Sequence, residues 1–493
     1  MKNTLTELLK SFSESDFIKF KDFVNSPYHN KIKNAGKLFS VLQNNPEDFE
    51  SGIFTKEELW KKIFPGKKYN YGTMKNLLHE LYKLAEKFIM YENFNLVEIE
   101  KFKHLYIGLF QRKMFSILDL KDKYFEKDYS DEKNIISEKG PRFIYQDLFY
   151  LYQLKMWKDH MLNPALNMKS ERIKMDNIFT SYVLINLFFN YSLLKGYSLN
   201  DKEKTDYINL SNFILDKISD ENMEILLQEI RKSSPLKYTI VKSHFLAYKA
   251  ISNENNISDY DNFKEFLFDN IDDLPSASKL DLIGLLDHSL YFSKAIKDKT
   301  KEKLDLLEFK FNNNLLFQNH EMLSGGELLY NLKPFFDNNR ADKFKEILAK
   351  YIEYIITENK ETYLRIANAQ YHFMKSEFDK SLEEISKINT DVFEVKLIMK
   401  RLLLMIYYEL NEYELFLSTY DSYKHFIRSI KFNSILRKNQ NTRAKTFFDL
   451  INELFKLRLK YDNYNAGILQ KKITDLNIDH KIWLLKKLKD LGA

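Results

Sequence analysis

Cysteine is absent from this chain of 493 residues. Its absence excludes disulfide bonds, cysteine-ligated zinc or iron–sulfur sites, and catalysis by a thiol. Glycine and proline are also scarce, with 12 and 8 positions respectively. Because these residues are the main interrupters of regular structure, their low content disfavours a β-rich or loop-rich fold. The lysine- and leucine-rich segments between them predict an all-α protein.

Long apolar segments are missing as well. The densest one, residues 182–194, is interrupted by Asn186 and Asn190, so it is shorter than the run of about 18 apolar residues that a membrane-spanning helix requires. The first residues carry acidic side chains and no apolar core of signal-peptide length. We therefore expect a soluble, cytoplasmic protein with no membrane partner.

Charge of one sign is not in large excess. The chain has 76 basic and 70 acidic residues, which give a net charge of +6. This near balance favours solvated helix surfaces over a dedicated polyanion-binding protein. Aromatic residues are abundant, with 40 Phe and 31 Tyr. Their large rings allow thin helical layers to build a core.

Catalytic motifs are lacking too. None of the ten histidines has another histidine three or four residues away, so the HExxH pattern of zinc enzymes does not occur. Residues 64–68 and 324–326 lack the full set of glycines, lysine and Ser/Thr of a phosphate-binding loop, and no Gly-x-Ser-x-Gly sequence exists. We expect no enzymatic activity, no metal and no cofactor.

The first 95 residues (1–95) are predicted to form a helical head. Ser13 with Asp16, and Thr55 with Glu58, have the spacing of capping boxes at helix starts. After the second of these helices, a Phe-Pro-Gly sequence at 64–66 predicts a break before a long helix. Two helices joined by such a tight turn have the outline of a helix-turn-helix.

Residues 96–252 are predicted to form a middle helical segment, which begins with a helix or a pair of helices broken near Gly108. The polar stretch at 253–259 is the most loop-like sequence of the interior. It separates the middle segment from a C-terminal array over residues 259–493. Helix pairs recur in this array, and we predict that their first helices begin near residues 276, 326, 361 and 392.

The clearest repetition lies between residues 361 and 430. Two long amphipathic helices each end in a polar turn with an aromatic residue, Ser376-Glu377-Phe378 and Asn411-Glu412-Tyr413. The two turns are 35 residues apart, from 378 to 413. This period is typical of stacked helix–turn–helix units.

This stretch resembles tetratricopeptide (TPR) repeats. The first unit matches that family at the small residues Ala369 and Ser381 and at Phe378 after the turn. The second unit keeps the aromatic residue after the turn but has Leu404 and Phe416 where small residues are usual, and both units lack the closing proline. The resemblance implies a right-handed superhelical solenoid of antiparallel helix pairs. Its concave groove would bind peptides or protein helices.

The whole chain also resembles uncharacterised bacterial helical-repeat proteins. The similar segments are Ser26–Asn30 (SPYHN), Tyr407–Tyr413 and Asp421–Phe426. This resemblance implies a helical-repeat architecture with a TPR-like C-terminal array and carries no assigned activity.

We therefore expect a non-catalytic scaffold or adaptor that binds a protein partner through the groove. The candidate groove residues are aromatic and basic side chains of the repeat: Tyr371, Tyr407, Tyr408, Tyr420 and Arg428.

Two basic regions support an alternative, a nucleic-acid-associated regulator. On the long helix of the head, an i, i+4 row consists of Lys75, His79, Lys83 and Lys87. In the basic region 424–460, the candidate contacts are Arg437, Lys438, Arg443 and Lys445. The head row lacks the Arg, Asn or Gln typical of base-reading helices, and the second region suits an acidic peptide as well. Solvated helix faces are the simplest interpretation of both.

Overall fold

The structure, a computed structural model, describes residues 4–43, 55–128, 132–198, 210–317, 323–355, 360–428, 435–476 and 478–492. Throughout these ranges the regular secondary structure is helical, apart from an isolated parallel β-bridge between Leu323 and Ile355. The predicted all-α class is therefore confirmed. In the same ranges, no helix is both long and apolar enough to cross a membrane.

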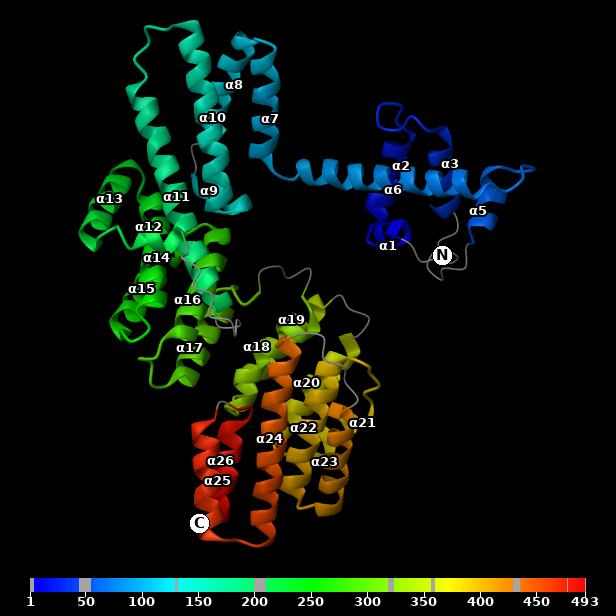
Figure 1. The fold of residues 1–493 in the computed structure, drawn as a ribbon, viewed down its shortest axis with the longest axis vertical. Coiled ribbons are helices and arrows are strands. Elements are labelled where there is room, and N and C mark those ends of the chain that lie inside the picture. The colour runs from blue at the N-terminus through cyan, green and yellow to red at the C-terminus, as the bar shows by residue number, and fades with distance from the viewer. Residues whose placement is uncertain are drawn as a thin grey trace. The chain divides into compact units, whose positions relative to one another are not determined.

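The chain divides into two compact units, Met1–Tyr182 and Val183–Ala493, whose elements Figure 1 labels. The boundary lies inside helix α11 (Lys169–Ser198). The predicted divisions after residues 95 and 252 both fall between helices. They remain predictions.

The first unit contains the head and a second group of helices. The head helices are α1 (Thr4–Lys10), α2 (Glu14–Asn25), α3 (Lys33–Gln43), α5 (Lys56–Ile63) and α6 (Tyr71–Phe94). The second group consists of α7 (Glu98–Gln111), α8 (Phe115–Asp128), α9 (Glu132–Lys139), α10 (Pro141–Leu162) and the first part of α11.

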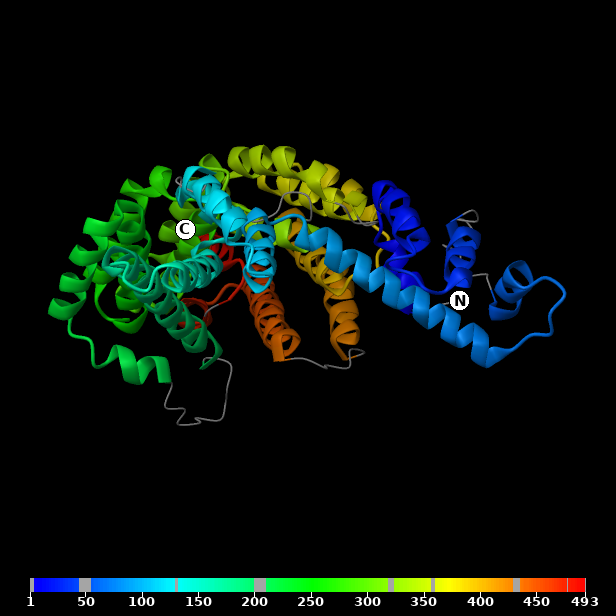
Figure 2. The same cartoon turned by 90° about the horizontal axis from the view of Figure 1, so that it is seen from above.

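Helix α6 organises the head, because α1, α2, α3 and α5 all contact it. Figure 2 shows it as the long helix of this region. Both predicted capping boxes are present: the hydroxyl of Ser13 accepts the N–H of Asp16 at 3.1 Å, and that of Thr55 accepts the N–H of Glu58 at 3.2 Å. Each acidic side chain accepts the backbone N–H of its capping residue in return. These local interactions fix the starts of α2 and α5.

The predicted break after α5 is also confirmed. The helix ends at Ile63, and Gly66 adopts a positive φ of 77° that only glycine takes without strain. The side chain of Asn70 then caps α6. The head core is aromatic, with the ring of Phe20 lying 4.8 Å from that of Phe39 and 5.3 Å from that of Phe88.

Of the two alternatives predicted for the start of the middle segment, the structure has the pair of helices, α7 and α8, but Gly108 lies inside α7 and the chain turns at residues 112–114. Lys113 has a left-handed backbone with φ 58°. The N–H of Met114 donates to the carbonyl of Leu109 at 3.0 Å, which satisfies a terminal helix carbonyl. The local backbone turn, and not the glycine, therefore ends the helix.

Charged residues on the inner face of α10 are neutralised within the first unit. The amine of Lys158 is buried and contacts Asp119 at 2.6 Å and Asp122 more closely. Burial alone would lower the pKa of Lys158, but these carboxylates raise it overall. Asp147 of the same helix pairs with Lys103 of α7.

The second unit continues α11 and divides into two groups of helices. The first group consists of α12 (Leu210–Leu215), α13 (Asp220–Ser233), α14 (Pro235–Ser252), α15 (Ile257–Asp269), the 3₁₀ turn η1 (Ile271–Asp273), α16 (Ser276–Phe292) and α17 (Lys299–Asn312). The second group consists of α18 (Gly325–Asp337), α19 (Ala341–Tyr351), the 3₁₀ turn η3 (Ile352–Tyr354), α20 (Lys360–Met374), α21 (Phe378–Ser386), α22 (Phe393–Leu410), α23 (Tyr413–Arg428), α24 (Ile435–Leu459), α25 (Asn463–Asp475) and α26 (Lys481–Leu491).

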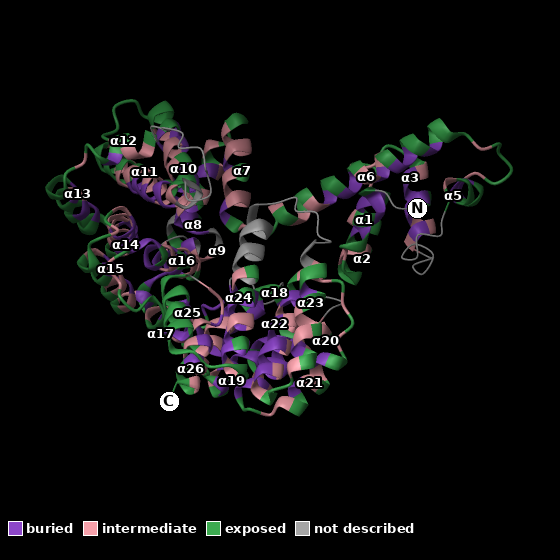
Figure 3. Ribbon diagram, turned by 60° about the horizontal axis from the view of Figure 1, so that its bottom comes forward, coloured by how far each residue is buried: buried purple, intermediate pink, exposed green. Residues whose placement is uncertain are grey.

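One continuous hydrophobic core extends from Leu304 to Leu488 through the second group. Buried residues are concentrated on α22 and its neighbours in Figure 3. Helices α16, α18, α20 and α22 begin within one residue of the first helices expected from the sequence. The amphipathic pattern therefore located these helices well.

Candidate functional site

Three consecutive helical hairpins, α18–α19, α20–α21 and α22–α23, share one kind of turn. In each turn a non-glycine residue has a left-handed backbone: Asn339 at φ 55°, Ser376 at φ 60° and Asn411 at φ 62°. The next residue donates its N–H to a carbonyl five positions earlier, at 2.8 to 2.9 Å. The turn residues at 339, 376 and 411 are thus 37 and 35 residues apart. This turn geometry closes the end of each first helix.

Small residues bring α20 and α21 close together. Ala369 and Ser381 are fully buried, and the hydroxyl of Ser381 donates to the carbonyl of Ala369 at 2.7 Å. Leu404 and Phe416, 35 residues further along the chain, are also fully buried. Large side chains therefore fill the corresponding helix contact in the α22–α23 hairpin.

The four groove candidates whose side chains are described lie against different neighbours. Tyr408 is only 2% exposed, and Tyr407 and Tyr371 are half-buried. The ammonium of Lys345 on α19 lies 4.7 Å from the ring of Tyr371. The hydroxyl of Tyr420 donates to Asp449 on α24 at 3.1 Å. The side chain of the fifth candidate, Arg428, is outside the described residues.

The chain's own C-terminal helices pack against α18 and α22. Helix α24 contacts α22 and α23, and α26 contacts α18 and α24. The ring of Trp483 on α26 lies 5.4 Å from that of Tyr408, and its indole N–H donates to Glu409 at 2.9 Å. Lys487, one helical turn further, pairs with Glu409 at 2.7 Å. An amphipathic helix is therefore held on this face by both aromatic and charged contacts.

A buried charge cluster fixes the start of α26, and we call its five residues the charged clasp: Lys333, Asp337, Arg401, Asp479 and His480. Asp479 accepts from the guanidinium of Arg401 at 2.6 Å and lies 3.3 Å from the amine of Lys333. Lys333 also pairs with Asp337, whose carboxylate lies 2.7 Å from Nδ1 of His480. The clasp thus joins α18 and α22 to the residues just before α26.

Two carboxylates of the charged clasp have depressed pKa values. Burial alone would raise the pKa of Asp479, but Arg401, Lys333 and His480 lower it well below its usual range. Burial alone would also raise the pKa of Asp337, but the nearby His480 and Lys333 lower it overall. Both carboxylates are therefore held in the ionised form that the cations require.

The charged clasp was not anticipated from the sequence, although a signal for it exists. Arg401 is a nearly isolated charge in the apolar run Leu397–Tyr408, apart from the neighbouring Lys400. A buried arginine needs a carboxylate partner. The sequence does not show that the partner is Asp479, because 78 residues separate the two.

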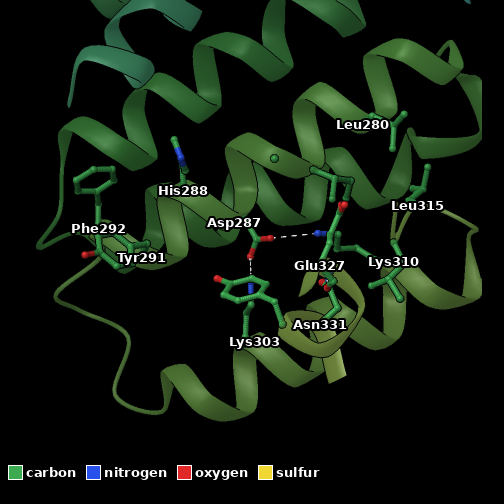
Figure 4. Close-up of a pocket in the computed structure, with 14 residues that line it drawn as sticks. Leu280, Asp287, His288, Tyr291, Phe292, Lys303, Lys310, Leu315, Glu327 and Asn331 are labelled. Carbon is green, nitrogen blue, oxygen red and sulfur yellow. Dashed lines mark hydrogen bonds and ion pairs between the residues drawn. The ribbon is translucent and has the colours of Figure 1, made fainter. Parts of the chain in front are cut away.

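A pocket of about 630 Å³ lies between α16, α17 and α18 (Figure 4). At its polar end, Asp287 pairs with Lys303 and, at 3.2 Å, with Lys310. Burial alone would raise the pKa of Asp287, but the two lysines lower it overall. The rest of the lining mixes apolar side chains such as Leu315 with the polar side chains of Glu327 and Asn331, and the described lining includes no serine or threonine.

The basic row of the head lies on the solvent side of α6. All four residues are exposed: Lys75, His79, Lys83 and Lys87. The opposite face carries buried leucines such as Leu77 and Leu81. Lys83 lies 3.5 Å from Glu80. The row is therefore accessible, with one acidic residue beside it.

The basic region 424–460 does not form one free cationic surface in the part of the chain that the structure describes. Arg458 donates to the carbonyl of Tyr408 and lies 4.9 Å from that ring. Lys424 pairs with Asp421 at 3.2 Å. Lys445 is exposed, whereas the side chains of the other candidates are outside the described residues: Arg437, Lys438 and Arg443.

Among the described residues, no group of three or more His, Asp or Glu side chains is placed to hold a metal ion. Comparison of the chain with protein-family models, curated proteins and solved structures finds no match.

Proposed function

We propose that this protein is a non-catalytic cytoplasmic scaffold that binds a helix of a protein partner. In this proposal the C-terminal hairpins form a superhelical solenoid of TPR-like pairs, and the partner helix lies in its concave groove. The supporting observation is that α18 and α22 already hold an amphipathic helix, α26, through the charged clasp and Trp483.

The contacts of α26 indicate what a partner helix would present. An acidic residue before the helix would meet Arg401, and an aromatic residue four positions later would meet Tyr408. A basic residue one turn further would pair with Glu409. Recognition of an amphipathic helix by such spaced anchors is a recurring mode of peptide binding.

A partner must compete with α26 for this surface. The apparent affinity is then the intrinsic affinity multiplied by the fraction of molecules in which α26 has left the surface. A substitution that weakens α26 without altering α18 or α22 should therefore increase binding.

The test uses a labelled peptide of residues 478–492 and the full-length chain. We expect the peptide to bind Trp483→Ala at least roughly thirtyfold more tightly than the unmodified chain, because a loss of about 2 kcal/mol in the docking of α26 raises the fraction of open molecules by that factor. Tyr464→Ala, at a residue 77% exposed on α25, is the matched control and should behave as the unmodified chain. A peptide in which alanine replaces the tryptophan should bind weakly. Absence of saturable binding to every variant would contradict the proposal.

The same peptide identifies a natural partner. Immobilised Trp483→Ala is incubated with nuclease-treated cell extract and eluted with the peptide. A protein that elutes with this peptide, and not with the alanine peptide, supports the proposal. Elution of nucleic acid alone from an untreated extract contradicts it.

The exposed basic row on α6 favours a second candidate function, association with nucleic acid. Binding through phosphate contacts weakens steeply with salt. Lys75→Glu together with Lys87→Glu should therefore reduce both the affinity for a labelled duplex and its salt dependence. Lys21→Glu, at an exposed residue of α2, is the control. Equal binding by both variants excludes the row as the contact surface.

A further inference from the structure

The exposed residues of α10 are all uncharged: Phe143, Gln146, Tyr150, Trp157, His160, Met161 and Leu162. The nearest cation is the half-buried Arg142, whose guanidinium lies 5.6 Å from the centre of the Phe143 ring. Charged residues make up 30% of the chain, and solvent-facing helix positions are where they are normally found. Of the charged residues of α10, Asp147 and Lys158 are buried and paired, and Arg142, Lys155 and Asp159 are half-buried. The exposed face thus differs from a solvated helix surface.

Three aromatic residues on this face have heptad spacing. Phe143, Tyr150 and Trp157 are seven residues apart and are 48%, 39% and 52% exposed. Side chains at this spacing form a seam along one side of a helix, to which another helix can be matched. Gln146 and Gln153 occupy the intervening positions. We call these five residues the α10 stripe.

We propose that the α10 stripe is a contact surface for a second copy of this chain, with the two α10 helices antiparallel. The spacing is symmetric, because Phe143 and Trp157 are each seven residues from Tyr150. A two-fold axis at Tyr150 would place Phe143 of each copy opposite Trp157 of the other. In an isologous dimer each such contact occurs twice.

The chemistry of the α10 stripe fits an identical surface. None of its five residues is charged, and the cation beside it, Arg142, lies over the ring of Phe143. Under the same two-fold axis, Gln146 of one copy lies beside Gln153 of the other. Paired amides in an otherwise apolar seam fix the register of two helices.

The exposed area sets the expected strength. Aromatic side chains bury roughly 150–250 Å² each, and about half of each ring of the α10 stripe is exposed. With Met161 and the glutamines, two copies would bury on the order of 1,000 Å², at the low end for specific interfaces. We therefore expect a reversible dimer. The dimer does not depend on the proposed groove, so either proposal can fail alone.

Sedimentation velocity of the full-length chain tests the association. The sedimentation coefficient should rise with concentration for the unmodified chain and stay monomeric for Trp157→Lys. Ile225→Lys, at a residue 57% exposed on α13, is the control and should dimerise normally. If the unmodified chain sediments as a monomer at every concentration, the proposal is overturned. This holds both if the α10 stripe binds another protein and if it binds nothing. A persistent dimer of Trp157→Lys overturns it as well.

Cross-linking tests the antiparallel geometry, and the chain has no cysteine to interfere. Gln146→Cys and Gln153→Cys chains of different tags are mixed and oxidised. Antiparallel pairing brings these two positions together, whereas two copies of residue 146 lie eight residues apart, or about 12 Å. A disulfide needs Cα atoms within about 7 Å. We expect mixed dimers at least severalfold above either self-linked dimer, and predominant self-linkage overturns the antiparallel arrangement.

Discussion

Of the three tryptophans of this chain, Trp483 on α26 and Trp157 on α10 lie in contrasting surroundings. Trp483 on α26 donates to Glu409 and lies against Tyr408. Trp157 on α10 is 52% exposed. Both helices are amphipathic, so an aromatic residue alone does not distinguish them. The surrounding charge does: α26 is anchored by ion pairs, whereas the outward face of α10 has none.

The comparison indicates that internal and external contacts use different chemistry here. The internal contact depends on buried charges that require specific partners. The surface proposed for self-association depends on apolar area alone. Substitutions should therefore affect folding at α26 and association at α10.

The largest effect is expected from Asp479→Ala, which would leave Arg401 buried without its carboxylate. Breaking one side of a buried ion pair costs about 3–5 kcal/mol. We expect the opening free energy of α26, measured by native-state hydrogen exchange, to fall by about 3 kcal/mol. Asp490→Ala is the control, because Asp490 is half-exposed and lies 3.7 Å from Lys487. An equal effect in the control would show that the charged clasp has no special role.

The second prediction compares the two tryptophans directly. Trp483→Ala should destabilise α26 by about 2–3 kcal/mol, because it removes packing against Tyr408. Trp157→Ala should change the stability of the monomer by less than about 0.5 kcal/mol and weaken the dimer. Hydrogen exchange and sedimentation velocity measure the two effects. If Trp157→Ala destabilises the first unit as strongly, the α10 stripe stabilises the fold of the monomer and is not an association surface.

Acid should loosen α26 through the charged clasp. The pKa values of Asp479 and Asp337 are depressed in the folded state, so their stabilisation is complete above the unfolded value of about 4 and is lost as pH falls below it. With Trp60→Phe and Trp157→Phe, the fluorescence of the remaining tryptophan reports on α26. Its emission should shift between about pH 4 and pH 2. Adding Asp479→Asn should reduce this response.

The smallest effects are expected from single changes of charge on the α10 stripe and on the exposed side of α26. Gln146→Glu would bring two carboxylates into the proposed dimer and should weaken it roughly threefold to tenfold. Lys486→Gln removes an exposed charge from α26 and should change stability by less than about 0.5 kcal/mol. Sedimentation and hydrogen exchange distinguish the two. An unchanged dimer in Gln146→Glu would place that residue outside the interface.

Much of the fold could be predicted because its signals are local. The capping boxes at Ser13 and Thr55 need only residues three positions away, and the break at Gly66 needs only its own backbone. The break between α7 and α8 lies a few residues beyond Gly108, where the sequence places it, because a left-handed lysine such as Lys113 has no sequence signature.

The candidate site was less predictable because it depends on distant residues. Tyr407 and Tyr408 are adjacent, so periodicity alone could not determine which one is covered by α24 and α26. The burial of Tyr408 follows from Phe455 and Trp483, which are 47 and 75 residues further along the chain. The basic region 424–460 was likewise divided by long-range contacts, since Arg458 contacts Tyr408.

The charged clasp determines which helices the surface of α18 and α22 would reject. Arg401 and Lys333 are fixed beneath the start of α26. A competing helix with well-matched apolar anchors but no leading carboxylate would bury Arg401 without its partner, whereas Lys333 would keep Asp337. That penalty of about 3–5 kcal/mol would favour helices that carry an acid at this position over helices that lack one.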